Sequence, residues 1–212
     1  MVHDLARRFA QRWAVARVSF AVPRGVACMV TGANGSGKTT LLRCVATALK
    51  PHHGSIQFDG SDLWVQRRTA RPNIALLSHA TRLYEDLDAR GNLQTWAKLG
   101  GYRPDITQLL ERVGLPNQRR DAVRTFSAGM RRRLALARVL IKRPKLLLLD
   151  EPFTALDPAG RELIIEIAKE LNAGGTTLLV ATHLPDVARR ICPEHLHMED
   201  GRVIDRSAGM VQ

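Results

Sequence analysis

The stretch from Gly32 to Thr39 constrains this chain more than any other feature of its sequence. It reads GANGSGKT and fits the pattern Gly-x-x-x-x-Gly-Lys-Ser/Thr at every fixed position. An apolar run from Val26 to Val30 precedes it, and apolar residues at helical spacing follow it from Leu41 to Leu49. The pattern therefore predicts a strand, a glycine-rich loop and a helix, an arrangement that binds the phosphates of a nucleoside triphosphate.

The residues of this loop have different expected roles. Backbone N–H groups turn inward around phosphate oxygens, and Gly35 and Gly37 are expected to adopt backbone angles that a Cβ atom would forbid. Lys38 is expected to reach the β- and γ-phosphates of ATP, while the hydroxyl of Thr39 ligates Mg²⁺. The loop residues expected to contact the nucleotide are Gly32, Asn34, Gly35, Ser36, Gly37, Lys38, Thr39 and Thr40. An ordinary glycine-rich turn is the alternative, and the strand and helix signals on both sides argue against it.

Two carboxylates follow a continuous apolar strand signal, Leu146 to Leu149. Only a strand covered on both faces has this pattern, so we expect it inside a parallel sheet, where ligands gather at the carboxyl ends of strands. Asp150 is then placed to hold Mg²⁺ through water, and Glu151 to polarise the water that attacks the γ-phosphate. The alternative is a pair of solvated acids that end a strand, which the phosphate-binding loop upstream disfavours.

Two further sites lie at the ends of predicted elements. Ser127 and Gly129 precede a helical pattern, so a hydroxyl and free N–H groups at a positive helix end form a second anion site. His183 follows a buried strand signal from Thr176 to Ala181 and lies on the same rim as Glu151. That position favours a catalytic role over the ordinary reading of a core or turn histidine.

Taken in order, these motifs resemble the ATP-binding subunits of ABC transporters over nearly the whole chain. The resemblance rests on the phosphate loop, the signature Phe126 to Met130, Asp150-Glu151, Ala155-Leu156-Asp157 and the switch histidine His183. It implies an α/β fold of the P-loop NTPase (RecA-like) type, with a mostly parallel sheet, an N-terminal antiparallel β subdomain and an inserted helical subdomain. Residues 1–212 would form one ABC ATP-binding domain, with its nucleotide-binding core in 1–79 and 142–212 and its helical insertion in 80–141. The polar helical pattern from Leu83 to Ile141 agrees with that insertion.

The resemblance also implies how the site is completed. Two subunits of this family sandwich two ATP molecules, so Ser127 and Gly129 of one copy would contact the γ-phosphate held by Lys38 of the other. Asp157 would communicate across the same interface. The implied assembly is a homodimer of these subunits within a complex with integral membrane subunits, peripheral at the cytoplasmic face of the inner membrane.

Two positions concern the base of the nucleotide and the membrane partner. The pattern leaves either Phe9 or Trp13 to stack on the adenine ring, and Phe9 matches the aromatic position of the family. His79 stands where the family has a glutamine that senses Mg²⁺ and the membrane subunit. A neutral imidazole accepts one hydrogen bond but does not copy an amide, which puts the usual role of that position in doubt.

The signature departs from the usual Leu-Ser-Gly-Gly-Gln through Phe126, Ala128 and Met130, while Ser127 and Gly129 remain. With the histidine at the glutamine position, residues 127–138 and 150–157 look like the haem-exporting ATPases of cytochrome c maturation. This narrower resemblance makes haem an expected indirect cargo.

The net charge and the lengths of the apolar runs restrict the kinds of partner that the chain is expected to have. The formal net charge is +12, which suggests an anionic partner such as nucleic acid or the cytoplasmic leaflet. The arginines are spread along the chain and form only short clusters, so a solvated surface with a mild membrane bias is favoured, and no nucleic acid is expected. The apolar runs are far shorter than the roughly 20 residues that span a bilayer. We therefore expect no membrane span, and we also expect no secretory signal. The chain is expected to be cytoplasmic, with its three cysteines buried and reduced.

Three other functions stay open on the sequence alone. The first is an ABC exporter subunit for a drug, lipid or other solute, because the cargo path lies in another chain. The second is a P-loop phosphotransferase, which would not need the signature from Phe126 to Met130. The third is a soluble ABC ATPase acting on nucleic acid, favoured by the charge but disfavoured by a single cassette without sustained heptads.

Overall fold

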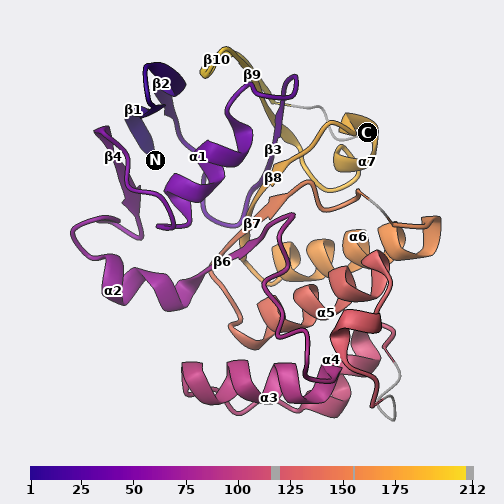
Figure 1. Cartoon of the computed structure of the whole chain (residues 1–212). Coiled ribbons are helices and arrows are strands. Elements are labelled where there is room, and N and C mark those ends of the chain that lie inside the picture. Colours follow the sequence, from indigo (N-terminus) through magenta and orange to yellow (C-terminus); the bar gives the residue numbers. More distant parts are fainter. Residues whose placement is uncertain (116–119, 155, 209–212) are drawn as a thin grey trace.

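The computed structural model describes residues 1–115, 120–154 and 156–208, and its elements form two sheets and a group of helices (Figure 1). The strands are β1 (Val2–Phe9), β2 (Arg12–Phe20), β3 (Ala27–Thr31), β4 (His53–Phe58), β5 (Ser61–Asp62), β6 (Ile74–Leu77), β7 (Leu146–Asp150), β8 (Thr177–Ala181), β9 (Glu194–Glu199) and β10 (Arg202–Ala208). The helices are α1 (Lys38–Val45), α2 (Arg67–Ala70), α3 (Ala89–Gly100), α4 (Ile106–Arg112), α5 (Ala128–Ile141), α6 (Pro158–Ala173) and α7 (Pro185–Ala188), with short 3₁₀ turns η1 (Arg71–Asn73) and η2 (Val123–Thr125).

The larger sheet has the strand order β10-β9-β3-β8-β7-β6, and every strand except β10 runs parallel to its neighbour. Its strands end in register, since Asp150 pairs with Ala181, which in turn pairs with Val30. The phosphate loop after β3, the carboxylates after β7 and the histidine after β8 therefore emerge at one edge. The predicted mixed α/β fold with a mostly parallel sheet is confirmed.

Both faces of this sheet are covered, as the apolar run in β7 predicts. Leu146 and Leu148 pack into a cluster with α1 and the N-terminal strands, whereas Leu147 and Leu149 pack into a cluster with α5 and α6. The smaller sheet, with the order β2-β1-β4-β5, is antiparallel and packs its apolar residues on the α1 side. Helix α1 thus lies between the two sheets (Figure 1).

The helices after β6 begin at capping residues. The carboxylate of Asp88 accepts a hydrogen bond from Gly91 N at 2.6 Å, and Asp105 does the same for Gln108 N at 3.0 Å, as expected for N-caps. Helix α3 ends at Gly100 and is capped by Gly101, whose φ of 70° a glycine adopts without strain.

Two expected helical boundaries differ from the structure. The segment from Leu83 is not helical before Ala89, because the buried Asn92 side chain ties it into a loop by accepting from Tyr84 N (2.8 Å) and donating to Tyr84 O (2.9 Å). Helix α1 ends at Val45 rather than near Leu49, since Thr47 has a φ of 57° that interrupts the helix.

Candidate nucleotide site

Backbone geometry explains why the loop before α1 needs glycine. Gly32 has a φ of 141°, and a Cβ atom there would lie 2.1 Å from Met198 O. Gly37 has a φ of 104°, and its Cβ atom would lie 2.1 Å from Ala14 O. Gly35 also has a positive φ, 83°, although the space around it is open. Gly35 and Gly37 therefore have the predicted positive φ angles. At Gly37 the carbonyl of Ala14 would also clash with the Cβ atom of any other residue.

Lys38 begins α1 and folds back over the loop. Its ammonium donates to Gly32 O at 2.7 Å and Ala33 O at 3.0 Å, and the residue is buried. The hydroxyl of Ser36 is also buried and has no hydrogen-bond partner among the described residues. A buried polar atom without a partner is rare in folded proteins, so this hydroxyl fits a loop shaped for a polar ligand.

Thr39 and Asp150 meet at the start of α1 and the end of β7. Thr39 Oγ1 donates to Asp150 Oδ1 at 2.9 Å, and Asp150 is only 4% exposed. Burial raises the pKa of the Asp150 carboxyl, and the Thr39 hydrogen bond partly offsets that rise. A hydroxyl and a carboxylate are hard oxygen donors, which suit Mg²⁺, an ion usually held by one or two protein ligands together with substrate phosphates.

Glu151 and His183 form a second pair on the same edge. His183 Nδ1 lies 2.7 Å from Glu151 Oε2, and His183 N donates to the same oxygen at 3.3 Å. Glu151 has a φ of 49°, a left-handed conformation that costs an L-residue roughly 1–2 kcal/mol. Its own N–H donates to Ala181 O at 2.8 Å and anchors it to the end of β8. Strained backbone of this kind clusters at functional sites.

Arg132 is a site residue that the sequence reasoning missed. It lies on α5 and is 6% exposed. Its guanidinium donates to Ser78 O (2.7 Å), Asp150 O (2.9 Å) and Glu151 O (2.7 Å). One signal was available: Arg132 shares the face of α5 at i+3 and i+4 with the buried Ala135 and Leu136, and a charged side chain on an apolar face needs a partner.

A cavity of about 350 Å³ lies over the loop. Its lining residues are Phe9, Arg12, Ala14, Asn34, Gly35, Gly37, Lys38, Thr39, Thr40 and Glu151. Phe9 is 48% exposed, and the Arg7 guanidinium lies 5.1 Å from its ring centroid. Trp13 instead lines a different hollow and packs against the rings of His52 and His53. Of the two aromatic candidates, Phe9 is the one beside the loop.

Ser127, Gly129, Asp157 and His79 are among the predicted residues that do not line that cavity. Ser127 caps α5 by accepting from Met130 N at 3.2 Å, and Gly129 follows in the first turn. Asp157 caps α6 by accepting from Gly160 N at 3.0 Å and lies 3.6 Å from Arg133. His79 is exposed on the segment after β6. Ala155 of the predicted Ala155-Leu156-Asp157 motif lies outside the described residues.

Two histidines near the C-terminus, His195 and His197, lie in strand β9. His195 Nε2 and His197 Nδ1 lie 2.5 Å and 2.9 Å from Thr31 Oγ1, which joins β9 to β3. Cys192, like Cys28 and Cys44, is a buried free thiol. Burial raises the pKa of all three thiols, which keeps them protonated.

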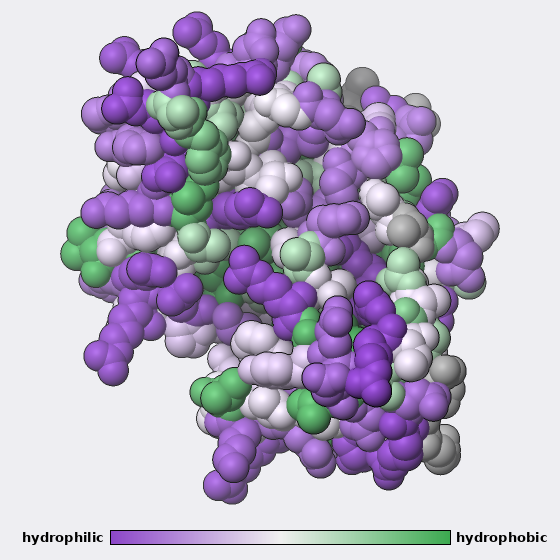
Figure 2. Space-filling view, viewed as in Figure 1, coloured by the Kyte–Doolittle hydropathy of each residue, from purple (hydrophilic) through white to green (hydrophobic). Residues whose placement is uncertain are grey.

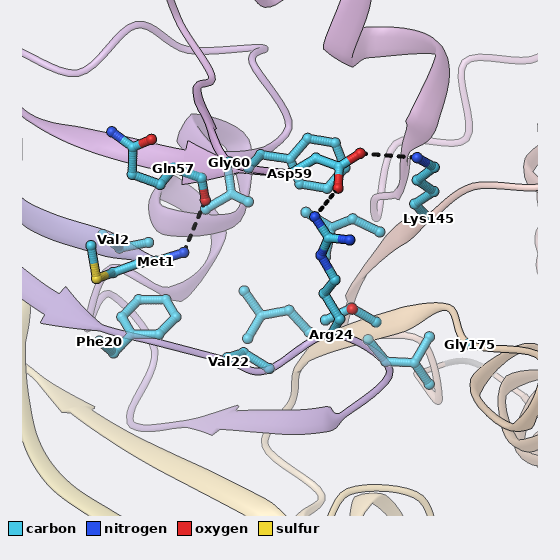
Figure 3. Close-up of a pocket in the computed structure, with 16 residues that line it drawn as sticks. Met1, Val2, Phe20, Val22, Arg24, Gln57, Asp59, Gly60, Lys145 and Gly175 are labelled. Carbon is cyan, nitrogen blue, oxygen red and sulfur yellow. Dashed lines mark hydrogen bonds and ion pairs between the residues drawn. The ribbon is translucent and has the colours of Figure 1, made fainter.

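A larger apolar cavity of about 470 Å³ lies at the opposite edge of the sheet (Figure 3). Leu146 and Thr177 at the amino ends of β7 and β8 contribute to its lining, and none of the predicted site residues does. At its rim Asp59 pairs with both Arg24 and Lys145, the latter at 2.9 Å. A hydrogen bond from Lys145 and the charge of Arg24 hold the pKa of the Asp59 carboxyl below its usual value.

The model of the ABC transporter family matches residues 15–154. The chain belongs to the ABC transporter family. Its domain is an ABC ATPase domain. The same fold occurs in the dimeric post-hydrolysis state of the ATP-binding cassette MJ0796 bound to ADP and Pi, with a TM-score of 0.89 and 23% identity over 100% of this chain and 99% of that chain.

Two curated relatives differ in what their names say they do. The daunorubicin resistance ATP-binding protein DrrA3 of Streptomyces coeruleorubidus is 38% identical over 96% of this chain, which spans 66% of that protein. The cytochrome c biogenesis ATP-binding export protein CcmA of Nitrosococcus oceani is 39% identical over 88% of this chain and 87% of its own length. Because the two sequence identities are so similar, they do not distinguish the haem-exporter resemblance from a drug-exporter one. In the described part of this chain, no helix is long and apolar enough to cross a membrane.

Proposed function

We propose that this chain is the ATP-hydrolysing subunit of an ABC transporter complex. The observation that carries the proposal is the convergence of Lys38, the Thr39–Asp150 pair and the Glu151–His183 pair at one edge of the parallel sheet. Phosphate binding, metal binding and activation of water are the three requirements of ATP hydrolysis, and each has a residue of suitable chemistry there.

The roles of these residues follow from their chemistry. Lys38 and the loop N–H groups would bind the β- and γ-phosphates of ATP, and Thr39 with Asp150 would hold Mg²⁺. The ion would supply charge neutralisation on the phosphate oxygens. The Glu151 carboxylate would accept a hydrogen bond from the attacking water. His183 would orient that carboxylate through the 2.7 Å contact between His183 Nδ1 and Glu151 Oε2.

We further propose that two copies of the chain form the active unit. Ser127, Gly129 and Asp157 do not line the cavity over the loop, so their expected contact with ATP needs a second copy. The dimeric state of the similar cassette supports this arrangement. Residues 80–141 would be the helical insertion that carries the signature, and 1–79 with 142–212 the core.

Haem export or haem handling for c-type cytochrome biogenesis is our proposed cargo role, at the cytoplasmic face of the inner membrane. The similarity to the cytochrome c biogenesis protein along most of both chains supports it. Export of a drug or another solute is the second candidate, favoured by the similarity to the daunorubicin resistance protein.

The test uses Glu151→Gln, which should bind ATP, hydrolyse it at least about 100-fold more slowly and accumulate as a dimer. The tagged variant is trapped with Mg-ATP in native membranes, and the copurified proteins and haem absorbance are recorded. Membrane subunits with haem support the haem role, whereas membrane subunits without haem favour the second candidate. Lys38→Ala is the matched control, because loss of tight ATP binding should prevent trapping.

A further inference from the structure

Two imidazole rings share one hydroxyl group directly before the phosphate loop. His195 and His197 are half-buried on β9, and Thr31 is the last residue of the adjacent buried strand β3. His195 Nε2 lies 2.5 Å from Thr31 Oγ1, and His197 Nδ1 lies 2.9 Å from the same oxygen. We call these three residues the histidine clamp. Because Gly32 follows Thr31 in the sequence, the clamp lies where β3 enters the phosphate loop.

The hairpin formed by β9 and β10 also contacts the loop farther along. A Cβ atom on Gly32 would lie 2.1 Å from Met198 O, so β9 and the loop are in close contact there. Gly201, between β9 and β10, donates from its N–H to Ser36 O at 3.1 Å. The Gly32 carbonyl in turn accepts a hydrogen bond from Lys38 Nζ at 2.7 Å. A shift of β9 would therefore displace both the loop and the lysine that it positions.

The hydrogen bonds of the clamp need an unprotonated ring nitrogen. A threonine hydroxyl donates one hydrogen bond, and its oxygen accepts others. One neutral imidazole can therefore accept from Thr31 Oγ1, while the other ring donates its N–H to the same oxygen. If both rings were imidazolium ions, both nitrogens would donate, and the hydroxyl hydrogen would lose its acceptor. The clamp is thus compatible with one charged imidazole but not with two.

The surroundings of the clamp oppose a second positive charge. The two ring centroids lie 6.2 Å apart, so two imidazolium ions would repel each other. Burial, the neighbouring His197 and the charge of Arg189 lower the pKa of His195. Asp205, which lies opposite His197 on β10, acts in the other direction and raises that pKa. Glu194 lies on the other face of β9, because side chains alternate along a strand.

Protons can reach the clamp from the outer side of the sheet. Strand β10 is the edge strand beside β9, and its residues Asp205, Arg206 and Ser207 are exposed. Figure 2 shows hydrophilic side chains over the part of the molecule where Figure 1 places β10. The half-buried rings of the clamp are therefore close to solvent and can titrate in the folded protein.

We propose that His195 and His197 are positioning residues for the phosphate loop, and that uptake of a second proton by the pair loosens the loop and weakens ATP binding. This inference rests on the proposed ATP-binding function and adds a pH-dependent control of the same site. Neither histidine lines the cavity over the loop, so both act through Thr31. The clamp is intact above the ordinary histidine pKa of 6.5, and its hydrogen bonds are lost as the pH falls below that value.

The test measures the Kd of Mg-ATP for the full chain at about pH 7.5 and about pH 5.5, on either side of the histidine pKa. The double variant His195→Gln with His197→Asn offers an amide in place of each ring, and an amide donates or accepts without taking up a proton. From the higher to the lower pH, the Kd of the parent should rise roughly three- to tenfold more than that of the variant, the effect of one lost hydrogen bond. The two proteins are compared at the same pH because phosphate groups themselves titrate near pH 6.

Two further variants locate the effect. His52→Gln with His53→Asn makes the same substitutions at two histidines that lie outside the clamp and outside the cavity over the loop, and it should keep the pH dependence of the parent. Thr31→Val removes only the shared hydroxyl. It should reduce the pH dependence as the double variant does, because the rings no longer act on the loop through that hydroxyl. Thermal unfolding at both pH values establishes that each variant folds.

Equal rises of Kd in the parent and the double variant would overturn the proposal. So would loss of the pH dependence in the His52 and His53 control, or a Thr31→Val protein that keeps the pH dependence of the parent. These outcomes are distinct from failure of the proposed function. That failure would appear as a parent protein that does not bind ATP at about pH 7.5, or as a Lys38→Ala protein that binds ATP equally well.

Discussion

The guanidinium of Arg132 donates a hydrogen bond to the main-chain carbonyl of Glu151 at 2.7 Å, across 19 residues of sequence. The same nitrogen also donates to Asp150 O, and the other terminal nitrogen to Ser78 O. One side chain of α5 therefore fixes the ends of both β6 and β7. Movement of α5 would shift the main chain of Glu151 through this contact, which makes Arg132 a positioning residue.

We expect Arg132→Met to lower kcat for ATP roughly 10- to 100-fold while ATP affinity changes little, because the base is displaced but the phosphate loop is untouched. Steady-state kinetics and nucleotide titration separate the two effects. Arg132→Lys should restore part of kcat, since its ammonium still reaches one of the carbonyls. Arg131→Met is the control: Arg131 also donates to backbone carbonyls, of Val123 and Arg124, and equal loss of kcat there would argue for a merely structural effect.

The Glu151–His183 pair predicts that a substitution of Glu151 lowers ATP turnover more than a substitution of His183. Glu151→Gln should remove nearly all of it, roughly 10²- to 10⁴-fold, because an amide cannot act as a base. His183→Ala should cost less, since the carboxylate remains but loses its 2.7 Å partner. Single-turnover measurements of phosphate release test this order. Turnover that survives in Glu151→Gln would remove Glu151 from the role of base.

The ionised carboxylate of Asp150 should lower the stability of the folded protein when no nucleotide is bound. Burial raises the pKa of its carboxyl above the unfolded value, so the folded state disfavours the ionised form and stability falls as pH rises past about 4. Asp150→Asn keeps an oxygen for the Thr39 hydroxyl and removes the charge. We expect its unfolding midpoint to rise by roughly 2–4 °C at pH 7, while the extra stabilisation by Mg²⁺ with ATP is lost.

Thermal unfolding with ATP alone, with Mg²⁺ alone and with both ligands measures the rise of the unfolding midpoint and the lost stabilisation by Mg²⁺ with ATP. Asp186→Asn, at an exposed acid that pairs with Arg189, is the matched control and should change neither quantity. A midpoint that falls in Asp150→Asn would contradict the cost assigned to the buried charge.

Asp59 should show the opposite pH dependence. Its pairs with Lys145 and Arg24 lower the pKa of its carboxyl, so the stability they contribute is present above the unfolded pKa near 3.8 and lost as pH falls through the folded pKa. Asp59→Asn should therefore be slightly less stable than the parent at pH 7, and the difference should shrink as the pH falls below about 3.8. Urea unfolding at pH 7 and at pH 3 makes the comparison, and a difference that does not shrink would point to packing instead of charge.

Phe9 and Trp13 offer a direct choice between two adenine platforms. Phe9 lines the cavity over the loop and Trp13 does not, so Phe9→Ala should weaken ATP binding roughly 5- to 100-fold, the range of one stacking contact. Trp13→Ala should leave it near the parent value. Affinities for ATP and for inorganic triphosphate, measured by calorimetry, isolate the base, because a lost stacking contact should spare triphosphate.

Much of the architecture was predictable because its signals are local. The glycines at Gly35 and Gly37, the apolar strand before Asp150 and the capping pair Asp157-Pro158 each express a rule that acts within a few residues. The start of α3 was wrong by several residues because Asn92 decides it through tertiary hydrogen bonds to Tyr84. Periodicity does not contain that information.

The sequence by itself determined which chemical groups this protein carries and the order of the elements that present them: Lys38 on a glycine-rich loop, Asp150 and Glu151 after a buried strand, His183 after another. Only the tertiary structure decided which groups meet. It placed Thr39 Oγ1 2.9 Å from Asp150 Oδ1, joined Arg132 to the carbonyl of Glu151, and put Phe9, not Trp13, in the lining of the cavity over the loop. The physical reason is that local rules set backbone conformation, whereas contacts between distant segments depend on how the sheets and helices pack together.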